Sequence, residues 1–528
     1  MNKTLTMKWT LWIIILLLSA ENVSANPKGA NVISGQASLA HPSANALTIT
    51  NSPNAIINWQ SFDINPNEIT RFIQQNGASA VLNRVVGNGL TASQIMGTLA
   101  SNGKVFLINP NGIVFGANSV VDTAGLIASS LNISDQDFLN NNLRFDGNAS
   151  NGALENKGYI KAGLNGDVFL IAPNIENSGI IETNGGHIIL AAGEKVSLAS
   201  FENENIVFQV QSPDNKVTNL GSIITNGGAA ELFAGTITHS GSINADSVSV
   251  DSQGQVVLAA SHDITLTQES QITSKSASIS VESESGELLQ QGTLSANKIH
   301  LTGSMVNNVG QTQASSTDMN TAEINIEGDY VLQQGVLQAS GGNINVQATN
   351  LYHSGLTSTD NPTATAGNIT INTTNRLDST GGSLITATGL TGGIITLGGN
   401  TGQIVTSATL SASGTQSGGT VEITANTVAL LNANIESDGG TTGGSIHLGG
   451  EWQGSGDLVH AKEVIIGVGT ELSATGETGG EIVIWSTESS SFYGSADTRG
   501  TLQGGQIELS SQGSLDWMGP DFAPITPG

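Results

Sequence analysis

The sequence predicts an all-β protein wound as a solenoid, and three observations support this fold class. A Gly-x-Ile or Gly-x-[Ile/Val]-x-[Leu/Ile/Val] pattern recurs at steps of about 20 to 26 residues, which is typical of stacked repeats. Short runs of alternating apolar and polar residues stand between Gly, Asn and Asp corners. Aromatic residues make up only 4% of the chain, so aliphatic side chains must supply most of the core. Together these features fit a right-handed parallel β-helix with an N-terminal cap and extra hairpins.

The first 25 residues have the pattern of a signal peptide. Lys3 and Lys8 form a positive start, residues 9–18 form a short apolar core, and the small-residue tripeptide that ends at Ala25 fits a cleavage site. We therefore expect the mature chain to begin at Asn26. The apolar run is too short to span a bilayer well, and we expect no membrane-spanning segment in the mature chain.

The region from residue 31 to about residue 131 predicts the first coils and the cap of the solenoid. A cap is required because the end of a stacked strand array exposes unpaired backbone N–H and C=O groups. Most of the region alternates with the period of a strand, as in segment 47–50. Segments 69–75 and 91–99 have the apolar spacing of helices, and we expect short helices there.

A tight corner lies near the end of this region. The tetrad NPNG at 109–112 stands between two apolar runs at 105–108 and 113–115. Asn is favoured at the first position of a type I β-turn, Pro presets φ at the second, and Gly is favoured at the fourth. The sequence therefore predicts a strand, a turn and a second strand. A similar tetrad, NPNE at 65–68, is expected to form another turn.

Two short elements in this region resemble signatures of a known family. They are NPNGI at 109–113 and NRV at 83–85, and both are similar to elements in the secretion domain of the filamentous haemagglutinin family. The members are exoproteins of bacterial two-partner secretion, and the high-molecular-weight adhesin branch is the most similar. The resemblance covers about residues 31–301, although the NPNE tetrad departs from an Asn-Pro-Asn-Leu motif of many members. The resemblance implies a secretion motif made of Asn83, Arg84, Asn109, Pro110, Asn111, Gly112 and Ile113.

Beyond residue 301 the repeat lengthens to about 25 residues and becomes more regular. Ile, Val and Leu alternate with Thr, Ser and Asn, so Ile344 and Ile423 are expected to face the core. Segment 451–461 lengthens one repeat and predicts a loop insertion. We expect four parts of the chain: a signal peptide (1–25), a capped β-helical secretion domain (26–300), a β-helical repeat region (301–515) and an irregular tail (516–528).

Charge and residue content exclude several classes of function. The formal net charge of −27 would repel nucleic acids and anionic membranes, so neither is an expected partner. The eight histidines lack the spacing of a zinc site, and we expect them at polar surface positions. The Gly-rich corners lack the Lys-Ser/Thr pair of a phosphate-binding loop. We therefore expect no catalytic residue, cofactor or metal; a β-helical polysaccharide-active enzyme is the distant alternative, and it would need clustered Asp, Lys and Arg.

The resemblance implies an export route and a set of partners. A dedicated outer-membrane β-barrel transporter with periplasmic modules would export the chain from the periplasm to the cell surface or the medium. A surface adhesin that binds a host-cell surface or another extracellular ligand is the leading interpretation. The alternatives are a haem-binding or haem-carrier-binding exoprotein, for which 451–461 is the sizeable insertion, and the carrier stalk of a contact-dependent toxin. The sequence leaves open whether the chain is complete or a fragment.

Overall fold

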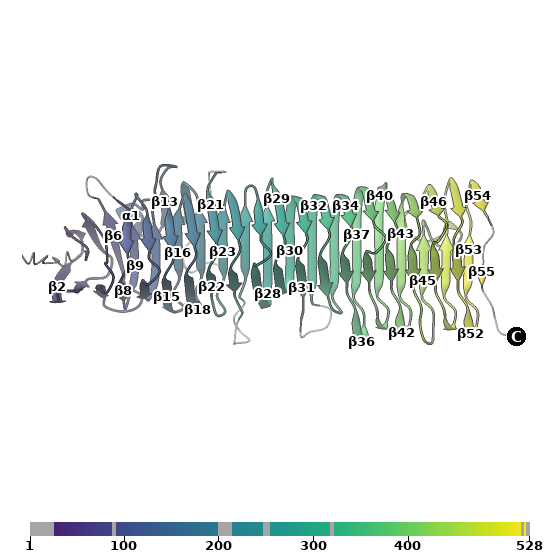
Figure 1. Cartoon of the computed structure of the whole chain (residues 1–528), viewed down its shortest axis with the longest axis horizontal. Coiled ribbons are helices and arrows are strands. Elements are labelled where there is room, and N and C mark those ends of the chain that lie inside the picture. Colours follow the sequence, from purple (N-terminus) through teal and green to yellow (C-terminus); the bar gives the residue numbers. More distant parts are fainter. Residues whose placement is uncertain are drawn as a thin grey trace, which may run out of the picture.

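A computed structural model of the protein describes residues 26–86, 91–198, 214–246, 254–316, 321–518 and 522–523. The described residues form one long rod in which short strands stack side by side along the long axis (Figure 1). β2 lies at the N-terminal end of the rod and β54 at the other end. The predicted signal peptide, including Ala25, lies outside the described residues.

Three columns of parallel strands run along the rod and build its walls. Each column is a ladder in which a strand pairs in parallel with its counterparts one coil earlier and one coil later. Seven long strands turn a corner and contribute to more than one column. This arrangement is a parallel β-helix, and the fold class predicted from the sequence is confirmed.

The first column contains β3 (Ala46–Asn51), β5 (Ile69–Ile73), β8 (Thr98–Ser101), β11 (Val120–Thr123), β15 (Tyr159–Leu164), β18 (Ile180–Asn184), β22 (Ser222–Ile224), β25 (Ser242–Asn244), β28 (Gln271–Ser283), β30 (Thr293–Asn308), β31 (Gln311–Ala314), β33 (Val336–Ala339), β35 (Leu356–Ser358), β38 (Leu384–Thr386), β41 (Thr409–Ser411), β44 (Asn434–Glu436), β47 (Glu471–Ser473), β51 (Ser495–Asp497) and β55 (Phe522–Ala523).

The second column contains β4 (Ala55–Trp59), β6 (Ala80–Val85), β9 (Lys104–Ile108), β12 (Gly125–Ser129), β16 (Val168–Ala172), β19 (Ile188–Ala192), β23 (Ala230–Ala234), β26 (Val256–Ala260), parts of β28 and β30, β32 (Glu323–Gln333), β34 (Asn343–His353), β37 (Asn368–Ser379), β40 (Ile394–Thr406), β43 (Thr420–Leu430), β45 (Ser445–Leu448), β49 (Glu481–Ile484) and β53 (Gln506–Leu509). The third column contains β7 (Ser93–Ile95), β10 (Ile113–Phe115), β14 (Leu154–Asn156), β17 (Asn174–Asn177), β21 (Lys216–Asn219), β24 (Thr236–His239), β27 (Ile264–Leu266), β29 (Glu287–Gln290), the C-terminal parts of β30, β32, β34, β37, β40 and β43, then β46 (Glu463–Ile466), β50 (Ser489–Phe492) and β54 (Ser514–Trp517).

Two antiparallel strands cover the N-terminal end of the rod, as a cap requires. β1 (Asn31–Ser34) pairs with β4, and β2 (Ala37–Ser43) pairs with β3, both antiparallel. Their hydrogen bonds satisfy backbone groups that the first coil would otherwise expose. The predicted cap is therefore present, and it consists of strands that run against the direction of the columns.

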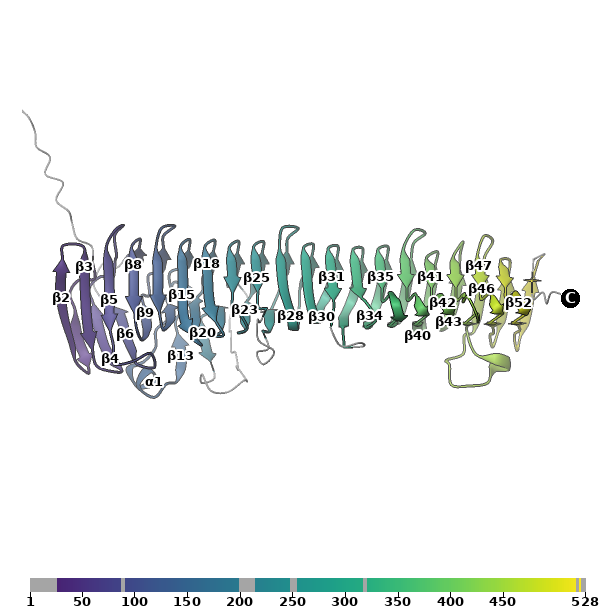
Figure 2. The ribbon, with the colours of Figure 1, turned by 90° about the horizontal axis from the view of Figure 1, so that it is seen from below.

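Several smaller elements lie outside the three columns. β13 (Leu143–Asp146) pairs antiparallel with β20 (Lys195–Leu198), and helix α1 (Asp135–Leu139) lies beside them on one side of the rod (Figure 2). Nearer the C-terminus, loops add two small parallel sheets that project from the rod (Figure 1): β36 (Asn361–Thr365) with β39 (Gly389–Thr391) and β42 (Gly414–Ser417), and β48 (Gly476–Thr478) with β52 (Gly500–Gln503).

The inside of the rod is a continuous stack of aliphatic side chains, because the period-two alternation places every second residue inward. Ile344 and Ile423 are both fully buried in this core, as predicted. The insertion at 451–461 is confirmed as a loop, and it contains the 3₁₀ helix η1 (Trp452–Gly454) between β45 and β46.

The two predicted short helices are wrong. Segment 69–75 forms β5, in which Thr70 and Phe72 face inward while Arg71 faces solvent. Segment 91–99 forms β7 and the start of β8, with Ser93 inward. In both segments ladder pairing to neighbouring coils overrides the helical spacing of a few apolar residues.

Candidate functional site

The NPNG tetrad forms the predicted turn between β9 and β10. The backbone N–H of Gly112 donates to the carbonyl oxygen of Asn109 at 2.9 Å, which closes the turn. Asn109 itself is buried, and its Nδ2 donates to the carbonyl of Thr91 and to Oγ of Ser93, both at 3.0 Å. Its Oδ1 accepts from the backbone N–H of Asn111 at 3.0 Å. The Asn109 side chain therefore ties the turn to the preceding coil.

The same turn is tied to the following coil through its backbone. The N–H of Gly152 donates to the carbonyl of Pro110 at 2.8 Å, and the N–H of Ile113 donates to the carbonyl of Ala153 at 3.2 Å. Gly112 has φ of 103°, and a Cβ there would lie 2.5 Å from the Ala153 oxygen, so both conformation and space require glycine. Of the five motif residues in this turn, Asn111 is the exposed one.

Asn83 lies inside the rod on β6 and joins two coils. Its Oδ1 accepts from the indole Nε1 of Trp59 at 3.0 Å, and its Nδ2 donates to the carbonyl of Phe106 at 3.2 Å. Its side chain is fully buried, so both bonds satisfy polar groups that would otherwise be costly to bury.

Arg84 points to the other side of β6 and holds the segment that leads into α1. Its Nη2 donates to the carbonyl of Ile133 at 2.7 Å, and its Nε donates to Oδ1 of Asn132 at 3.0 Å. Its Nη1 lies 2.8 Å from Oδ1 of Asp135, and its side chain is only 14% exposed. One guanidinium thus binds three residues, Asn132, Ile133 and Asp135, of a segment outside the columns.

The structure places the two motif elements on consecutive coils of one wall. β6 pairs with β9, and Asn83 stands opposite Leu107 while Arg84 stands opposite Ile108. Both elements therefore lie together in the fold, but the side chains of Asn83, Arg84 and Asn109 point into the protein or onto the segment that leads into α1, and Asn111 is the exposed member.

A second apolar core lies between the wall and the elements held by Arg84. It contains Phe106, Phe138 of α1, Phe145 of β13 and Phe169, and the rings of Phe106 and Phe138 meet edge to face at 5.0 Å. Helix α1 was not predicted from the sequence. Its signal was present, because Ser134 caps the helix by accepting from the N–H of Asp137 at 3.0 Å.

Asn26, the expected first residue of the mature chain, is buried against the cap. Oγ1 of Thr70 donates to Oδ1 of Asn26 at 3.0 Å, and the following Lys28 pairs through its backbone with Ser61. The described chain is therefore attached to the first coils from its first residue onward.

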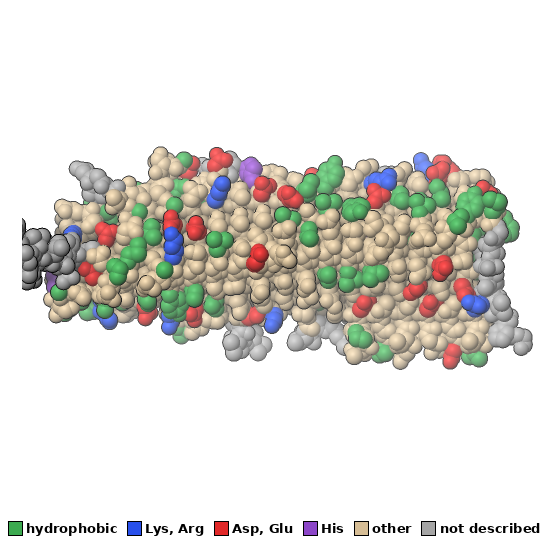
Figure 3. Space-filling view, in the orientation of Figure 1, with side chains coloured by type: hydrophobic (Ala, Val, Ile, Leu, Met, Phe, Trp, Pro, Cys, Tyr) green, Lys and Arg blue, Asp and Glu red, His purple; other side chains and the backbone are tan. Residues whose placement is uncertain are grey.

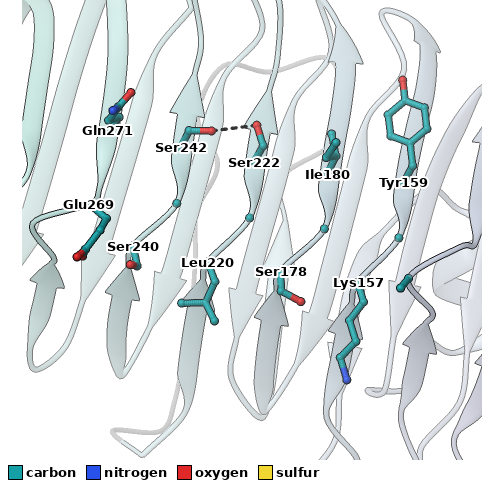
Figure 4. Close-up of a pocket in the computed structure, with 15 residues that line it drawn as sticks. Lys157, Tyr159, Ser178, Ile180, Leu220, Ser222, Ser240, Ser242, Glu269 and Gln271 are labelled. Carbon is teal, nitrogen blue, oxygen red and sulfur yellow. Dashed lines mark hydrogen bonds between the residues drawn. The ribbon is translucent and has the colours of Figure 1, made fainter.

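A shallow groove of about 660 Å³ crosses six coils, from Ala117 to Gln271, where the third column turns into the first. Figure 4 shows two rows of side chains along it, Lys157, Ser178, Leu220, Ser240 and Glu269 on one side and Tyr159, Ile180, Ser222, Ser242 and Gln271 on the other. The Tyr159 hydroxyl donates to Oε2 of Glu182, and this bond, with burial, raises the pKa of Tyr159 to about 12. Among the described residues that line the groove, Glu269 is the one carboxylate, so the groove lacks the pair of facing carboxylates that glycoside hydrolysis uses.

Two of the eight histidines contradict the expectation of surface positions. His239 and His353 are fully buried inside the rod, where burial lowers the pKa of each imidazole to about 4. Each stands two residues before a corner glycine, a position where other coils carry Asn or Gln. The recurring polar residue two before the glycine was the signal that could have predicted inward polar positions.

Within the described ranges, no group of three or more His, Asp or Glu side chains is arranged to hold a metal ion. The helices in that part of the chain are all too short to cross a membrane.

The N-terminal part of the chain is similar to proteins of a known family. Residues 24–274 match the TPS secretion domain family. A heme/hemopexin-binding protein of Haemophilus influenzae strain Rd is 32% identical over 229 residues, and the match covers 40% of this chain and 23% of that protein. A second Haemophilus influenzae protein with the same description is 37% identical over 105 residues, 20% of this chain and 11% of that protein. The chain thus spans less than a quarter of the length of the curated relatives that it matches.

A solved structure also aligns with the chain. The crystal structure of the HMW1 secretion domain from Haemophilus influenzae is 25% identical, with a TM-score of 0.43, and the alignment covers 94% of this chain and 100% of that one. The resemblance inferred from NPNGI and NRV is confirmed by the family match: residues 24–274, just under half of the chain, match the TPS secretion domain, which is the secretion domain of two-partner secretion exoproteins.

Proposed function

We propose that a dedicated outer-membrane β-barrel transporter exports this chain and that the rod is displayed outside the cell, at the surface or in the medium. The TPS secretion domain implies such a transporter as partner. In our division, residues 26–300 are the secretion region, and residues 301–515 are the displayed rod.

The single observation that carries this proposal is the stacking of the columns. Each strand pairs with its counterparts one coil earlier and one coil later, so a coil that leaves the transporter finds a folded template in the coil before it. Folding outside the cell then makes backward movement unfavourable at each step. A capped N-terminal end supplies the first template.

For the secretion motif we propose a mainly structural role. Asn83 and Asn109 are buried and use their amides inside the protein, and Arg84 is engaged with Asp135 and the Ile133 carbonyl. Loss of Asn83 or Asn109 would weaken the first coils as a template, and loss of Arg84 would weaken the segment that leads into α1. Asn111 is exposed at the turn and is the candidate for direct contact with the transporter.

Binding of purified variants to the periplasmic modules of the transporter separates these roles. Asn109→Ala and Asn111→Ala are matched, because both remove one amide from the same turn. A folded Asn109→Ala protein that binds like wild type supports the structural role, whereas weaker binding by a folded Asn109→Ala protein contradicts it. Circular dichroism and hydrogen exchange report whether each variant is folded.

The displayed rod carries a surface that suits an adhesin. Met305, Tyr330 and Tyr352 stand on consecutive coils of the third column and are 37%, 55% and 39% exposed. Figure 3 shows apolar side chains gathered on the face over β32 and β34. Tyrosines in such positions combine an apolar ring with a polar hydroxyl, as in binding surfaces. We propose this face as a contact surface for an extracellular ligand.

Adherence of cells that display the chain tests this surface. The double variant Tyr330→Ala, Tyr352→Ala is expected to reduce adherence without lowering the amount of displayed protein. Tyr159→Ala is the matched control, because Tyr159 lies in the secretion region and its hydroxyl is bound to Glu182. Equal loss of adherence in both variants would contradict a specific role for this face.

A haem-carrier-binding exoprotein is the second candidate, because two relatives are described as heme/hemopexin-binding proteins. The loop at 451–461 projects from the rod and exposes Trp452, while the His460 ring packs on Trp485 at 4.3 Å (Figure 2). Calorimetric titration with haem-loaded hemopexin tests it, with a Trp452→Ala variant compared with wild type. Absence of binding by the wild-type chain would remove this candidate.

A further inference from the structure

A column of buried polar side chains runs inside the rod, at the end of the third column of strands. Successive members stand opposite one another in the strand register, and each lies at the corner before the next strand of its coil. We call them the polar column, and its members are Asn156, Asn177, Asn219, His239, Gln290, Asn308, Gln333, His353, Ser379 and Thr406. Leu266 interrupts the column between His239 and Gln290.

The first part of the polar column is a directional chain of hydrogen bonds. Nδ2 of Asn156 donates to Oδ1 of Asn177 at 2.8 Å, and Nδ2 of Asn177 donates to Oδ1 of Asn219 at 2.7 Å. Asn219 therefore presents its NH₂ to Nδ1 of His239 at 3.0 Å, so this ring nitrogen must accept. A neutral imidazole can accept this bond at Nδ1, although its buried Nε2 has no hydrogen-bond partner among the described residues, whereas a protonated ring would present N–H to NH₂.

Reversal of the three amides would not repair this conflict without cost. Oδ1 of Asn156 accepts from the backbone N–H of Gly158 at 3.2 Å, and reversal would remove that acceptor. A buried N–H without a partner is unfavourable, and the imidazolium charge would still lie in an aliphatic core.

The second part of the polar column also contains a buried histidine. Nδ2 of Asn308 donates to Oε1 of Gln333 at 2.7 Å, and Nε2 of His353 lies 2.9 Å from Oγ1 of Thr357. His353 stands opposite Gln333 in the preceding coil and Ser379 in the following one. Both histidines thus occupy positions that other coils fill with neutral amides or hydroxyls.

Among the residues that the structure describes, no charged group compensates a proton on either ring. Around His239 the charged residues of the neighbouring strand and turn, Lys216 and Glu269, are exposed, and the column neighbours are Asn219 and Leu266. Around His353 the charged residues on the packed strands are outside the core. They are Glu323, Glu327, Asp329, Arg376 and Asp378. Protonation of either ring would therefore place an unpaired charge in the core.

We propose that the polar column makes the middle of the rod acid-sensitive. The coils that contain His239 and His353, which we call the histidine coils, stay folded when the rings are neutral and unfold locally when the rings take up protons. In the unfolded chain the pKa of a histidine ring is near 6.5, and in the folded chain the pKa of both buried rings is lower, at about 4. The folded state therefore binds fewer protons, and stability is complete above about pH 6.5 and is lost as pH falls toward 4. One affected coil, that of His239, lies in the secretion region, and the other, that of His353, lies in the repeat region.

Neutral residues at the same position in neighbouring coils suggest replacements for the two histidines. His239→Asn copies Asn219 and Asn177 at the same register position, and His353→Gln copies Gln333. Hydrogen exchange of the mature chain, measured at pH 7.5 and pH 5.0 and corrected for intrinsic rates, reports opening of β24 and β34. For wild type, we expect the opening equilibrium of each histidine coil to rise roughly 20-fold at pH 5.0. The double variant should show less than a threefold change.

Two further variants keep the result unambiguous. His187→Asn removes an exposed histidine from the rod and should retain the full acid response. His239→Leu, which copies Leu266, should open more readily at both pH values but without the pH dependence of its own coil. An equal acid response in wild type and in the double variant would overturn the proposal, as would a response spread evenly over all coils.

Discussion

The first coils and the last coils of the rod are built from the same strand columns but are stabilised differently. Most of the largest fully buried aromatic side chains belong to the N-terminal part; they are Trp59, Phe62, Phe72, Phe115 and Phe145, whereas Phe492 belongs to the C-terminal part. The rings of Trp59 and Phe62 meet edge to face at 5.6 Å. Large rings supply more burial per residue than aliphatic side chains.

Side-chain hydrogen bonds between coils also differ between the first and the last coils. Asn83, Arg84 and Asn109 each connect segments that are 16 or more residues apart in the sequence. In the later coils, two corners share one arrangement: the Asp360 carboxylate accepts from Thr388, and the Asp438 carboxylate accepts from Thr475, in each case from the following coil.

The difference follows from the order of folding. A coil that adds to an existing end forms its ladder on a fixed template, whereas the first coils have none and must pay the cost of ordering the backbone from their own contacts. We therefore expect damage in the first coils to spread along the rod and damage in the last coils to stay local. The following substitutions test that expectation.

The largest effect is expected from a charge placed in the aliphatic stack. Ile344→Asp and Ile423→Asp each replace a fully buried side chain with a carboxylate, and each should lower the free energy of unfolding of nearby coils by at least about 4 kcal/mol. Urea unfolding gives the magnitude, and hydrogen exchange shows where protection is lost. The secretion region should keep its protection. Thr370→Asp adds the same charge on the outer side and should change stability by less than about 0.5 kcal/mol.

Removal of one buried ring from each end compares the two regions directly. Trp59→Ala and Phe492→Ala should each cost about 3 to 5 kcal/mol locally, since both rings are fully buried. Trp59→Ala also leaves Oδ1 of Asn83 without its donor. We expect Trp59→Ala to reduce exchange protection through all the first coils and Phe492→Ala only beyond about residue 463. Equally local losses in both variants would contradict the template argument.

The sequence allowed the fold class to be predicted because period-two alternation and corner glycines repeat along the chain. The same pattern correctly placed Ile344 and Ile423 inward, and NPNG was correctly predicted as a turn. The helices expected at 69–75 and 91–99 were wrong, since local apolar spacing does not report the ladder partners in neighbouring coils.

The candidate site was only partly accessible from the sequence. The motif letters identified Asn83, Arg84 and Asn109, but not that Arg84 anchors the segment before α1 or that Asn83 bonds to Trp59. These partners are 24 to 49 residues away and depend on how the coils stack. The buried positions of His239 and His353 were missed for another reason, because the polar residue that recurs two positions before the corner glycine was not used as a signal.

Arg84 should stabilise α1 and β13 more than it stabilises the strand columns of the rod. Arg84→Ala removes three contacts from a mostly buried guanidinium, and we expect a loss of about 2 kcal/mol in the local stability of α1 and β13. Hydrogen exchange of residues 131–146 should rise, while that of β16 changes little. Arg71→Ala, at an exposed position of β5, is the matched control and should leave both unchanged. A uniform loss of protection over the first coils would show that Arg84 supports the rod itself.

The smallest contrast is expected within the NPNG turn. Asn109→Ala leaves the Ser93 hydroxyl and the Thr91 carbonyl without their buried donor, so it should lower the stability of the first coils by about 1 to 3 kcal/mol. Asn111→Ala changes an exposed side chain and should cost less than about 0.5 kcal/mol. Urea unfolding of the mature chain compares the two. If both variants unfold alike, the buried Asn109 amide does not stabilise the turn, and the structural explanation of the motif loses its strongest contact.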